Sequence, residues 1–234
     1  MFRLACLLLS FGWIALGTAA AADLVLRPSQ LKDVLQRTRA SSKPGRILVE
    51  GTHFLTEPIV LGQEDSGVAW VGREGAVLMG GRVIAGWQPA GEHLWKAPLP
   101  EKDWVIEQLW IDGRRATRAR SPNRGYFHLT ERATPEMFPE VKGSLNHQAF
   151  CVTPGEFALL SAIPATQRDE VLLTVTHAWA VGQCRIQELK EDGLAVRIRG
   201  HSRYPFVEDE PDQRWWVENF RAALDAPGEW FLDR

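Results

Sequence analysis

The sequence predicts a mainly β protein that begins as a right-handed parallel β-helix, and two observations point to this fold. Between residues 45 and 83, short apolar runs rich in β-branched residues alternate with glycine-rich corners, and each run is too short for a helix. The runs are Ile47–Val49, Ile59–Leu61, Val68–Val71 and Ala76–Leu78. They recur at one constant interval, which separates Val49 from Val71, Leu55 from Val77, and Leu61 from Val83. Such an interval is typical of solenoids, in which equivalent residues of successive coils stack in one continuous core.

Residues 1–22 predict a signal peptide. Arg3 supplies a positive charge, Leu4–Leu16 is apolar, and Ala20–Ala22 fits a small-residue cleavage site before Asp23. The apolar part is too short to span a bilayer, so we expect no membrane span. The mature chain is therefore expected to be secreted or periplasmic.

Residues 23–85 are expected to form a capping helix and the first β-helix coils. After a short strand at Asp23–Leu26, Ser29 is a candidate N-cap for an amphipathic helix that ends before Gly45. The apolar face of this helix contains Leu31, Val34 and Leu35. A helix at this place would cover the open end of the solenoid core, which otherwise exposes apolar surface and unpaired strand edges.

Residues 86–203 predict an antiparallel β domain inserted into the β-helix. The regular interval stops at Gly86, Trp87 and Trp95 flank a hairpin-like loop, and Asp112-Gly113 is a strong hairpin signal. Further strands are expected at Phe157–Leu160, Glu170–His177, Cys184–Leu189 and Leu194–Ile198. A turn at residues 191–193 would join the last two strands.

Residues 204–234 are expected to return towards the β-helix. Pro205–Asp212 is an acidic loop, and Val217–Leu224 has the length and composition of two helical turns. Pro227-Gly228 ends that helix, and Glu229–Leu232 resumes as a strand.

Composition describes an ordinary globular protein and excludes some partners. The 234 residues are 45% hydrophobic and 24% charged, and the net charge of −2 comes from interspersed residues of both signs. This pattern does not favour a nucleic-acid or anionic-membrane partner. Ten tryptophans accompany only two tyrosines. Tryptophan rings either stack on sugars or fill a core, so a polysaccharide or oligosaccharide partner enters as a hypothesis.

Several motifs occur in a characteristic order along the mature chain. They are Gly80-Gly81, Gly86-Trp87, Gln108–Ala116, Arg118–Asn123, His177–Trp179, Val217–Phe220 and Leu224–Asp233. With these motifs the sequence resembles secreted bacterial right-handed parallel β-helix proteins, in particular glycoside hydrolases of the α-galactosidase and α-L-fucosidase kind. Those enzymes interrupt the β-helix early with a β domain.

The resemblance implies that catalytic carboxylates lie on later coils, beyond the part that this chain matches. We therefore expect the chain to be the amino-terminal, truncated portion of such a protein and to be inactive alone. Glycoside hydrolysis usually needs two facing carboxylates, and no pair is marked here by its spacing on stacked strands. The catalytic residues are unknown at this stage.

The candidate substrate-binding residues lie in and near a tryptophan pair. Trp215 and Trp216, followed by Glu218 and Asn219, combine ring stacking with hydrogen-bonding groups, and Trp179 is a further candidate. The alternative is that the pair fills the core and that Asn219 bonds the backbone. For Trp179, as for the other tryptophans, the alternative is that the ring fills the core.

No metal or cofactor site is predicted. Residues 208–212 are acidic, but no calcium-loop pattern accompanies them, and the six histidines form no zinc motif. Cys151 and Cys184 remain in the mature chain, either bridged or as two separate thiols.

Two functions of different classes remain. One is a glycoside hydrolase-like protein, and the other is a non-catalytic carbohydrate-binding or surface-interaction module of β-helix type. A polysaccharide lyase is a third hypothesis. It would need calcium or a Lys/Arg base beside an acidic sugar, which the sequence does not mark.

Overall fold

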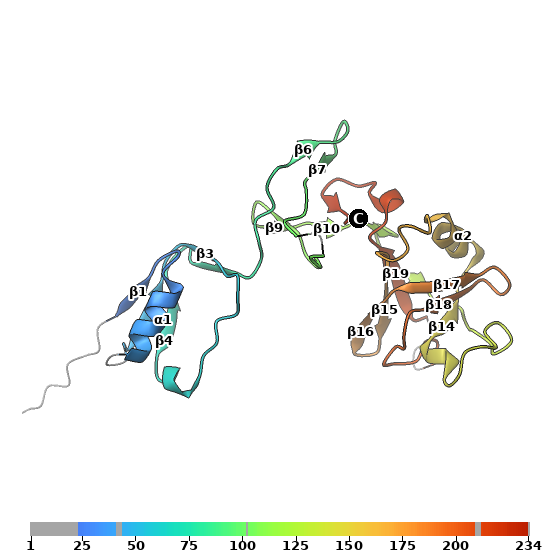
Figure 1. Cartoon of the computed structure of the whole chain (residues 1–234). Coiled ribbons are helices and arrows are strands. Elements are labelled where there is room, and N and C mark those ends of the chain that lie inside the picture. Colours follow the sequence, from blue (N-terminus) through green and yellow to red (C-terminus); the bar gives the residue numbers. More distant parts are fainter. Residues whose placement is uncertain (1–22, 41–43, 102, 209–211, 234) are drawn as a thin grey trace, which may run out of the picture. The chain divides into compact units, whose positions relative to one another are not determined.

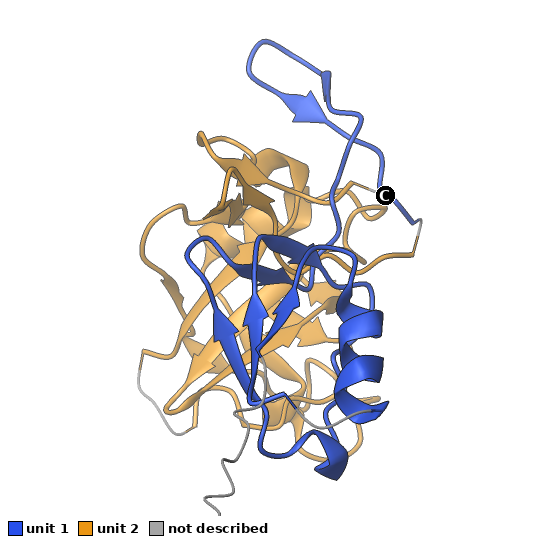
Figure 2. Cartoon of the chain, turned by 90° about the vertical axis from the view of Figure 1, so that its left-hand side faces the viewer, with its two compact units in different colours: residues 1–102 blue, residues 103–234 orange. Residues whose placement is uncertain are grey.

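The computed structural model describes residues 23–40, 44–101, 103–208 and 212–233, and it is mainly β (Figure 1). The described part contains two α-helices among many short strands. The predicted signal peptide and the centre of the acidic loop lie outside the described residues. The chain divides into two compact units, residues 1–102 and 103–234 (Figure 2). The domain boundaries expected near residues 86 and 204 stay predictions.

The first unit is built on two small parallel sheets. The strands of the first are β1 (Leu24–Leu26), β2 (Arg46–Val49) and β4 (Ala69–Gly72), and those of the second are β3 (Thr52–Phe54) and β5 (Val77–Met79). Helix α1 (Leu31–Ala40) packs Val34 against the first sheet, where Leu26, Ile47 and Val49 are also buried. Arg39 of α1 pairs with the buried carboxylate of Asp65, in the short 3₁₀ turn Gln63–Asp65, at 2.7 Å.

The predicted pairing of equivalent residues in the first unit is wrong in register. Val49 pairs with Gly72 instead of Val71, and Val77 pairs with Thr52 instead of Leu55. Val71, expected beneath Val49, is 39% exposed. A slip of one residue turns every side chain of a strand to the other face, and alternation normally reveals the correct register. Because residues 68–71 are apolar at every position, the sequence contains no alternation to read there.

Ser29 is not the N-cap of α1. The helix begins at Leu31, and the Ser29 hydroxyl donates a hydrogen bond to the Pro28 carbonyl at 2.5 Å. Ser29 also adopts a left-handed φ of 68°, whereas an N-cap residue usually has extended backbone angles. A tight turn at residues 28–29 therefore occupies the hydroxyl that the prediction assigned to the cap.

Two predicted hairpins are confirmed. Strands β6 (Gln88–Pro89) and β7 (Trp95–Lys96) pair in antiparallel fashion around the loop that Trp87 and Trp95 flank. Strands β8 (Trp110–Ile111) and β9 (Arg114–Arg115) pair around Asp112 and Gly113, whose φ angles are 49° and 74°. Two positive φ angles define the turn type that an Asp-Gly pair favours.

Besides the β8–β9 hairpin, the described part of the second unit contains two larger antiparallel sheets. The strands of the larger sheet are β11 (Arg120–Ser121), β19 (Arg214–Glu218), β15 (Leu172–His177) and β16 (Ala180–Cys184), with β12 (Phe127–His128) also paired to β19. The strands of the other sheet are β13 (Glu131–Arg132), β14 (Ala149–Cys151), β18 (Ala195–Ile198) and β17 (Ile186–Lys190). In addition, β10 (Thr117–Arg118) pairs in parallel with β20 (Glu229–Trp230).

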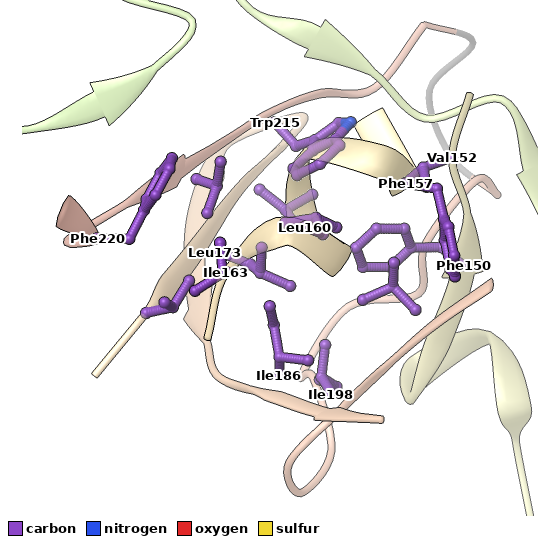
Figure 3. Close-up of a cluster of buried hydrophobic side chains, with 14 of the residues drawn as sticks. Phe150, Val152, Phe157, Leu160, Ile163, Leu173, Ile186, Ile198, Trp215 and Phe220 are labelled. Carbon is purple, nitrogen blue, oxygen red and sulfur yellow. The ribbon is translucent and has the colours of Figure 1, made fainter. Parts of the chain in front are cut away.

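A large core joins these sheets to helix α2 (Pro154–Ala162) (Figure 3). Leu160 of α2, Phe150 of β14 and Leu173 of β15 are fully buried in it. Trp215 of β19 is also fully buried, and its ring centroid lies 5.0 Å from that of Phe127 and 6.0 Å from that of Phe150. The core therefore fixes β19 and leaves the opposite face of its sheet for other contacts.

Three predicted elements differ in the structure. Phe157–Leu160, expected as a strand, belongs to α2, because Thr153 and Glu156 form a capping box that starts a helix at Pro154. Val217–Leu224, expected as a helix, contains the end of β19 and only the 3₁₀ turn Arg221–Ala223. Cys184–Leu189 is divided between β16 and β17.

Candidate functional site

A cavity of about 650 Å³ lies within the second unit, against the larger sheet. Its lining comes from the segment 105–108, from β9, β10 and β11, and from strands β15, β16, β19 and β20. Successive residues of a strand point to opposite faces. Trp215 and Val217 of β19 are buried in the core, so Trp216 and Glu218 line the cavity on the other face.

The register of the larger sheet places polar groups beside one another in the cavity. Glu218 is opposite Arg120 of β11 on one side and Leu172 of β15 on the other. Trp216 is opposite Thr174, which in turn is opposite Gln183 of β16. Neighbouring side chains on one face of a sheet are within reach of each other. The wall of the cavity thus combines an indole, a carboxylate, a hydroxyl and an amide.

Trp216 is held in place by three neighbours. Its indole N–H donates to Glu218 Oε1 at 2.5 Å, and the Tyr126 ring centroid lies 5.5 Å from its own. The Arg120 guanidinium lies over the Trp216 ring, 4.7 Å from the centroid. These contacts fix the ring before any ligand binds, which lowers the entropy cost of recognition.

Four arginines line the same cavity. They are Arg115, Arg118, Arg120 and Arg185. Arg118 donates from Nη2 to the carbonyls of Ile106 and Glu107, at 2.6 and 2.9 Å, and its guanidinium lies 4.9 Å from the centre of the Trp230 ring. Burial lowers the pKa of the Arg118 guanidinium, and the nearby Glu218 carboxylate opposes that shift.

Arg120 is held in the same way. It donates from Nε to the Pro122 carbonyl at 3.0 Å and from Nη2 to the Gly125 carbonyl at 2.8 Å. Burial also lowers the pKa of Arg120. Three glutamates, Glu107, Glu170 and Glu218, complete the charged lining.

Only some of the predicted binding residues line the cavity. Trp216 and Glu218 line the cavity together, whereas Trp215 fills the core, as its alternative interpretation predicts. Trp179 is 82% exposed in the connection between β15 and β16, with the Tyr204 ring 6.3 Å away, and it does not line this cavity.

Asn219 borders the cavity, but its side chain bonds the backbone. Its Nδ2 donates to the carbonyls of Glu170 and Leu232, at 3.1 and 3.3 Å, and its Oδ1 accepts from Leu232 N–H at 2.8 Å. The residue is 3% exposed and has a left-handed φ of 68°. These contacts fit the alternative interpretation, in which the Asn219 side chain bonds the backbone.

Sequence reasoning missed the arginines and Tyr126. A signal was present, because Arg118 and Arg120 are two residues apart and such residues share one side of an extended segment. The partners of these side chains come from distant parts of the chain, such as Trp216 and Trp230, which no local pattern reveals.

Cys151 and Cys184 are free thiols. Burial raises the pKa of the Cys184 thiol to about 12. Burial and the nearby Glu131 carboxylate also raise the pKa of the Cys151 thiol.

Within the described ranges, no group of three or more His, Cys, Asp or Glu residues is placed to hold a metal ion. None of the helices described is long and apolar enough to cross a membrane.

Among known proteins, this chain is similar in structure to a solved protein. No family model matches the sequence, and no curated protein matches it. A solved structure described as "Glycoside hydrolase" superposes with a TM-score of 0.63 at 21% sequence identity. The fold is glycoside hydrolase-like. The match covers 91% of this chain but 42% of the solved one, so the chain spans less than half the length of that protein.

Proposed function

We propose that this protein is a secreted or periplasmic carbohydrate-active protein of β-helix type that binds a polysaccharide or oligosaccharide in the 650 Å³ cavity. The observation that carries the proposal is the placement of Trp216 beside Glu218 in a cavity of a glycoside hydrolase-like fold. A fixed aromatic ring with adjacent polar groups suits a sugar, which has apolar C–H faces and a rim of hydroxyl groups.

The β-helix part of the proposal is supported by parallel pairing. Strands β1, β2 and β4 stack in parallel, as do β3 and β5, and β10 with β20. In the first unit, β2 and β3 follow one another along the chain, and β4 and β5 then pair with them in the same order. Successive coils of a solenoid stack equivalent strands in this way.

Saccharide binding is tested with a panel of oligosaccharides and isothermal titration calorimetry. We expect Trp216→Ala to weaken binding roughly tenfold, because the stacked ring is lost. Trp87→Ala is the matched control, since Trp87 is also partly exposed but belongs to the first unit. Equal loss in both variants, or no binding by the unchanged protein to any saccharide, would contradict the proposal.

Turnover of nitrophenyl glycosides separates a hydrolase from a binding module. Hydrolysis needs two carboxylates that flank the scissile bond. Glu107 and Glu170 also line the cavity, but in the row of the sheet that contains Glu218 the residues directly opposite it are Arg120 and Leu172, neither of which is an acid. We therefore expect binding without turnover, and turnover that Glu218→Gln abolishes would favour the hydrolase instead.

A polysaccharide lyase is the second candidate, and one observation favours it. No pattern in the sequence indicated a Lys or Arg base that could act on an acidic sugar. In the folded chain, however, four arginines line the cavity. Lyase activity on acidic polysaccharides would appear as a rise in ultraviolet absorbance from the unsaturated product.

A further inference from the structure

We propose that the sugar bound in the cavity is negatively charged and carries a carboxylate or a sulfate group. This inference rests on the proposed function, because it assumes that the cavity binds a saccharide, and it specifies the chemical class of that saccharide. Arginine is the side chain best suited to such groups, because its planar guanidinium matches carboxylate and sulfate oxygens with two parallel hydrogen bonds.

The arrangement of the arginines in the cavity supports an anionic ligand. Arg118 and Arg120 follow one another on β10 and β11, Arg115 belongs to β9, and Arg185 lies between β16 and β17. Four cationic side chains from separate segments thus converge on a cavity large enough for a sugar.

The hydrogen bonds of the two more buried arginines go to neutral groups. Arg118 donates to two backbone carbonyls and lies over Trp230, and Arg120 donates to two other carbonyls and lies over Trp216. In the described part of the chain, Nη1 of each makes no hydrogen bond, so one edge of each fork remains for a ligand. A partly desolvated cation without a directly bonded anion is costly, and an anionic ligand would remove that cost.

The glutamates offset this charge only in part. Three glutamates line the cavity with the four arginines, and Glu218 already accepts the indole N–H of Trp216. Glu107 and Glu218 attract the Arg118 charge, while Arg115 and Arg185 repel it. The cationic groups of the lining therefore outnumber the acidic ones, which leaves a net positive charge for an anionic ligand to neutralise.

Matched pairs of ligands test the charge directly. The probes are oligogalacturonates against their fully methyl-esterified forms, and sulfated oligosaccharides against their desulfated forms, in calorimetric titrations of the purified chain. Each pair keeps the same rings and linkages and differs at the anionic group, which is esterified in one pair and replaced by a hydroxyl in the other. We expect the charged member of at least one pair to bind roughly tenfold more tightly, as one charge-assisted interaction requires. The preferred pair identifies the anionic group.

Substitutions of single arginines test whether the preference for the charged ligand arises in the cavity. Arg118→Gln should reduce the preference for the charged ligand, and Arg115→Gln should do the same from an exposed position where the fold is less at risk. Arg221→Gln is the matched control, because Arg221 also lies over an aromatic ring, Phe231, but outside the cavity. Raising the salt concentration should weaken binding of the charged ligand more than binding of the neutral one.

The outcomes distinguish this inference from the proposed function. If charged and neutral partners bind equally and Trp216→Ala weakens both, the cavity binds sugars and the inference about charge is wrong. If no saccharide binds, both proposals fail. A preference for the charged ligand that Arg221→Gln removes as strongly as Arg118→Gln also contradicts the inference, because the effect would not come from the cavity.

Discussion

Asn219 shows how one side chain can fix the border of the cavity without contacting a ligand. It joins the end of β19 to the carbonyl of Glu170 before β15 and to both backbone groups of Leu232. Asparagine is one of the few residues that tolerate a left-handed conformation, which its φ of 68° requires. The residue therefore holds two cavity-lining segments in register.

Asn219→Ala is expected to destabilise the second unit. The substitution leaves buried backbone groups without partners and places a residue with a Cβ but no polar group at a left-handed position. We expect a loss of roughly 2–4 kcal/mol in the free energy of unfolding, measured by urea denaturation. Asn123→Ala is the control, because the exposed Asn123 side chain donates to the Asp225 carboxylate at the surface, and its loss should be about 0.5 kcal/mol or less.

Cys184 is expected to resist thiol reagents in the folded protein. The reactive species is the thiolate, and a pKa raised to about 12 keeps the thiol protonated at neutral and mildly alkaline pH. Because the raised pKa favours the protonated form of the native state, its contribution to stability is present below the unfolded pKa near 9 and is lost as the pH rises towards 12. Labelling at pH 8 should be slow for the native chain and fast in urea. Fast labelling of Cys184 in a Cys151→Ala variant without denaturant would contradict this.

At the scale of elements, helix α2 depends on its first turn. The Thr153 hydroxyl accepts from Glu156 N–H at 3.4 Å, and the Glu156 carboxylate accepts from Thr153 N–H at 2.8 Å. Thr153→Ala should therefore lower the free energy of unfolding by about 1 kcal/mol. Thr153→Ser keeps the cap and should lie close to the unchanged protein. Equal stability of the alanine and serine variants in urea denaturation would contradict a capping role.

Elements with local turn chemistry were predictable from the sequence, and elements defined by distant contacts were less so. The Asp112-Gly113 hairpin follows from two residues that tolerate positive φ. The segment Phe157–Leu160 is an apolar run that fits a strand or a buried helix equally, and only the preceding capping box distinguishes them. The strand register of the first unit could not be predicted, because residues 68–71 lack alternation.

At the scale of the whole chain, the candidate site could be predicted only in part. Trp216 and Glu218 were recognised because a tryptophan pair stands next to residues that can form hydrogen bonds, although Glu218 was expected in a helix and not on a strand. Their partners Arg120 and Tyr126 lie far earlier in the sequence, and antiparallel pairing of β19 with β11 and β12 brings them close. Local spacing in the sequence does not predict pairing between strands so far apart. The cationic lining of the cavity could therefore be recognised only in the folded chain.

The two units differ in how completely they bury apolar surface. In the described part, the cluster of the first unit contains four buried residues, whereas the main cluster of the second unit contains eighteen. Large apolar side chains of the first unit remain exposed: Phe54, Val60, Leu61, Val71, Val77, Leu78, Val83, Trp87 and Trp95. Several lie on or beside β3 and β5, whose sheet has only these two strands in the described chain. Exposed apolar groups on unpaired strand edges favour association between molecules.

Leu78→Lys is therefore expected to reduce aggregation of the purified chain. Leu78 is 46% exposed on β5, and a lysine there keeps an aliphatic stem while placing a charge where another strand would add. The concentration at which light scattering rises should increase, and binding of an apolar fluorescent dye should fall. Gln36→Lys on the exposed face of α1 adds the same charge without removing apolar surface. If both variants raise the threshold equally, net charge rather than the exposed face of β5 controls association, and the explanation from strand edges is wrong.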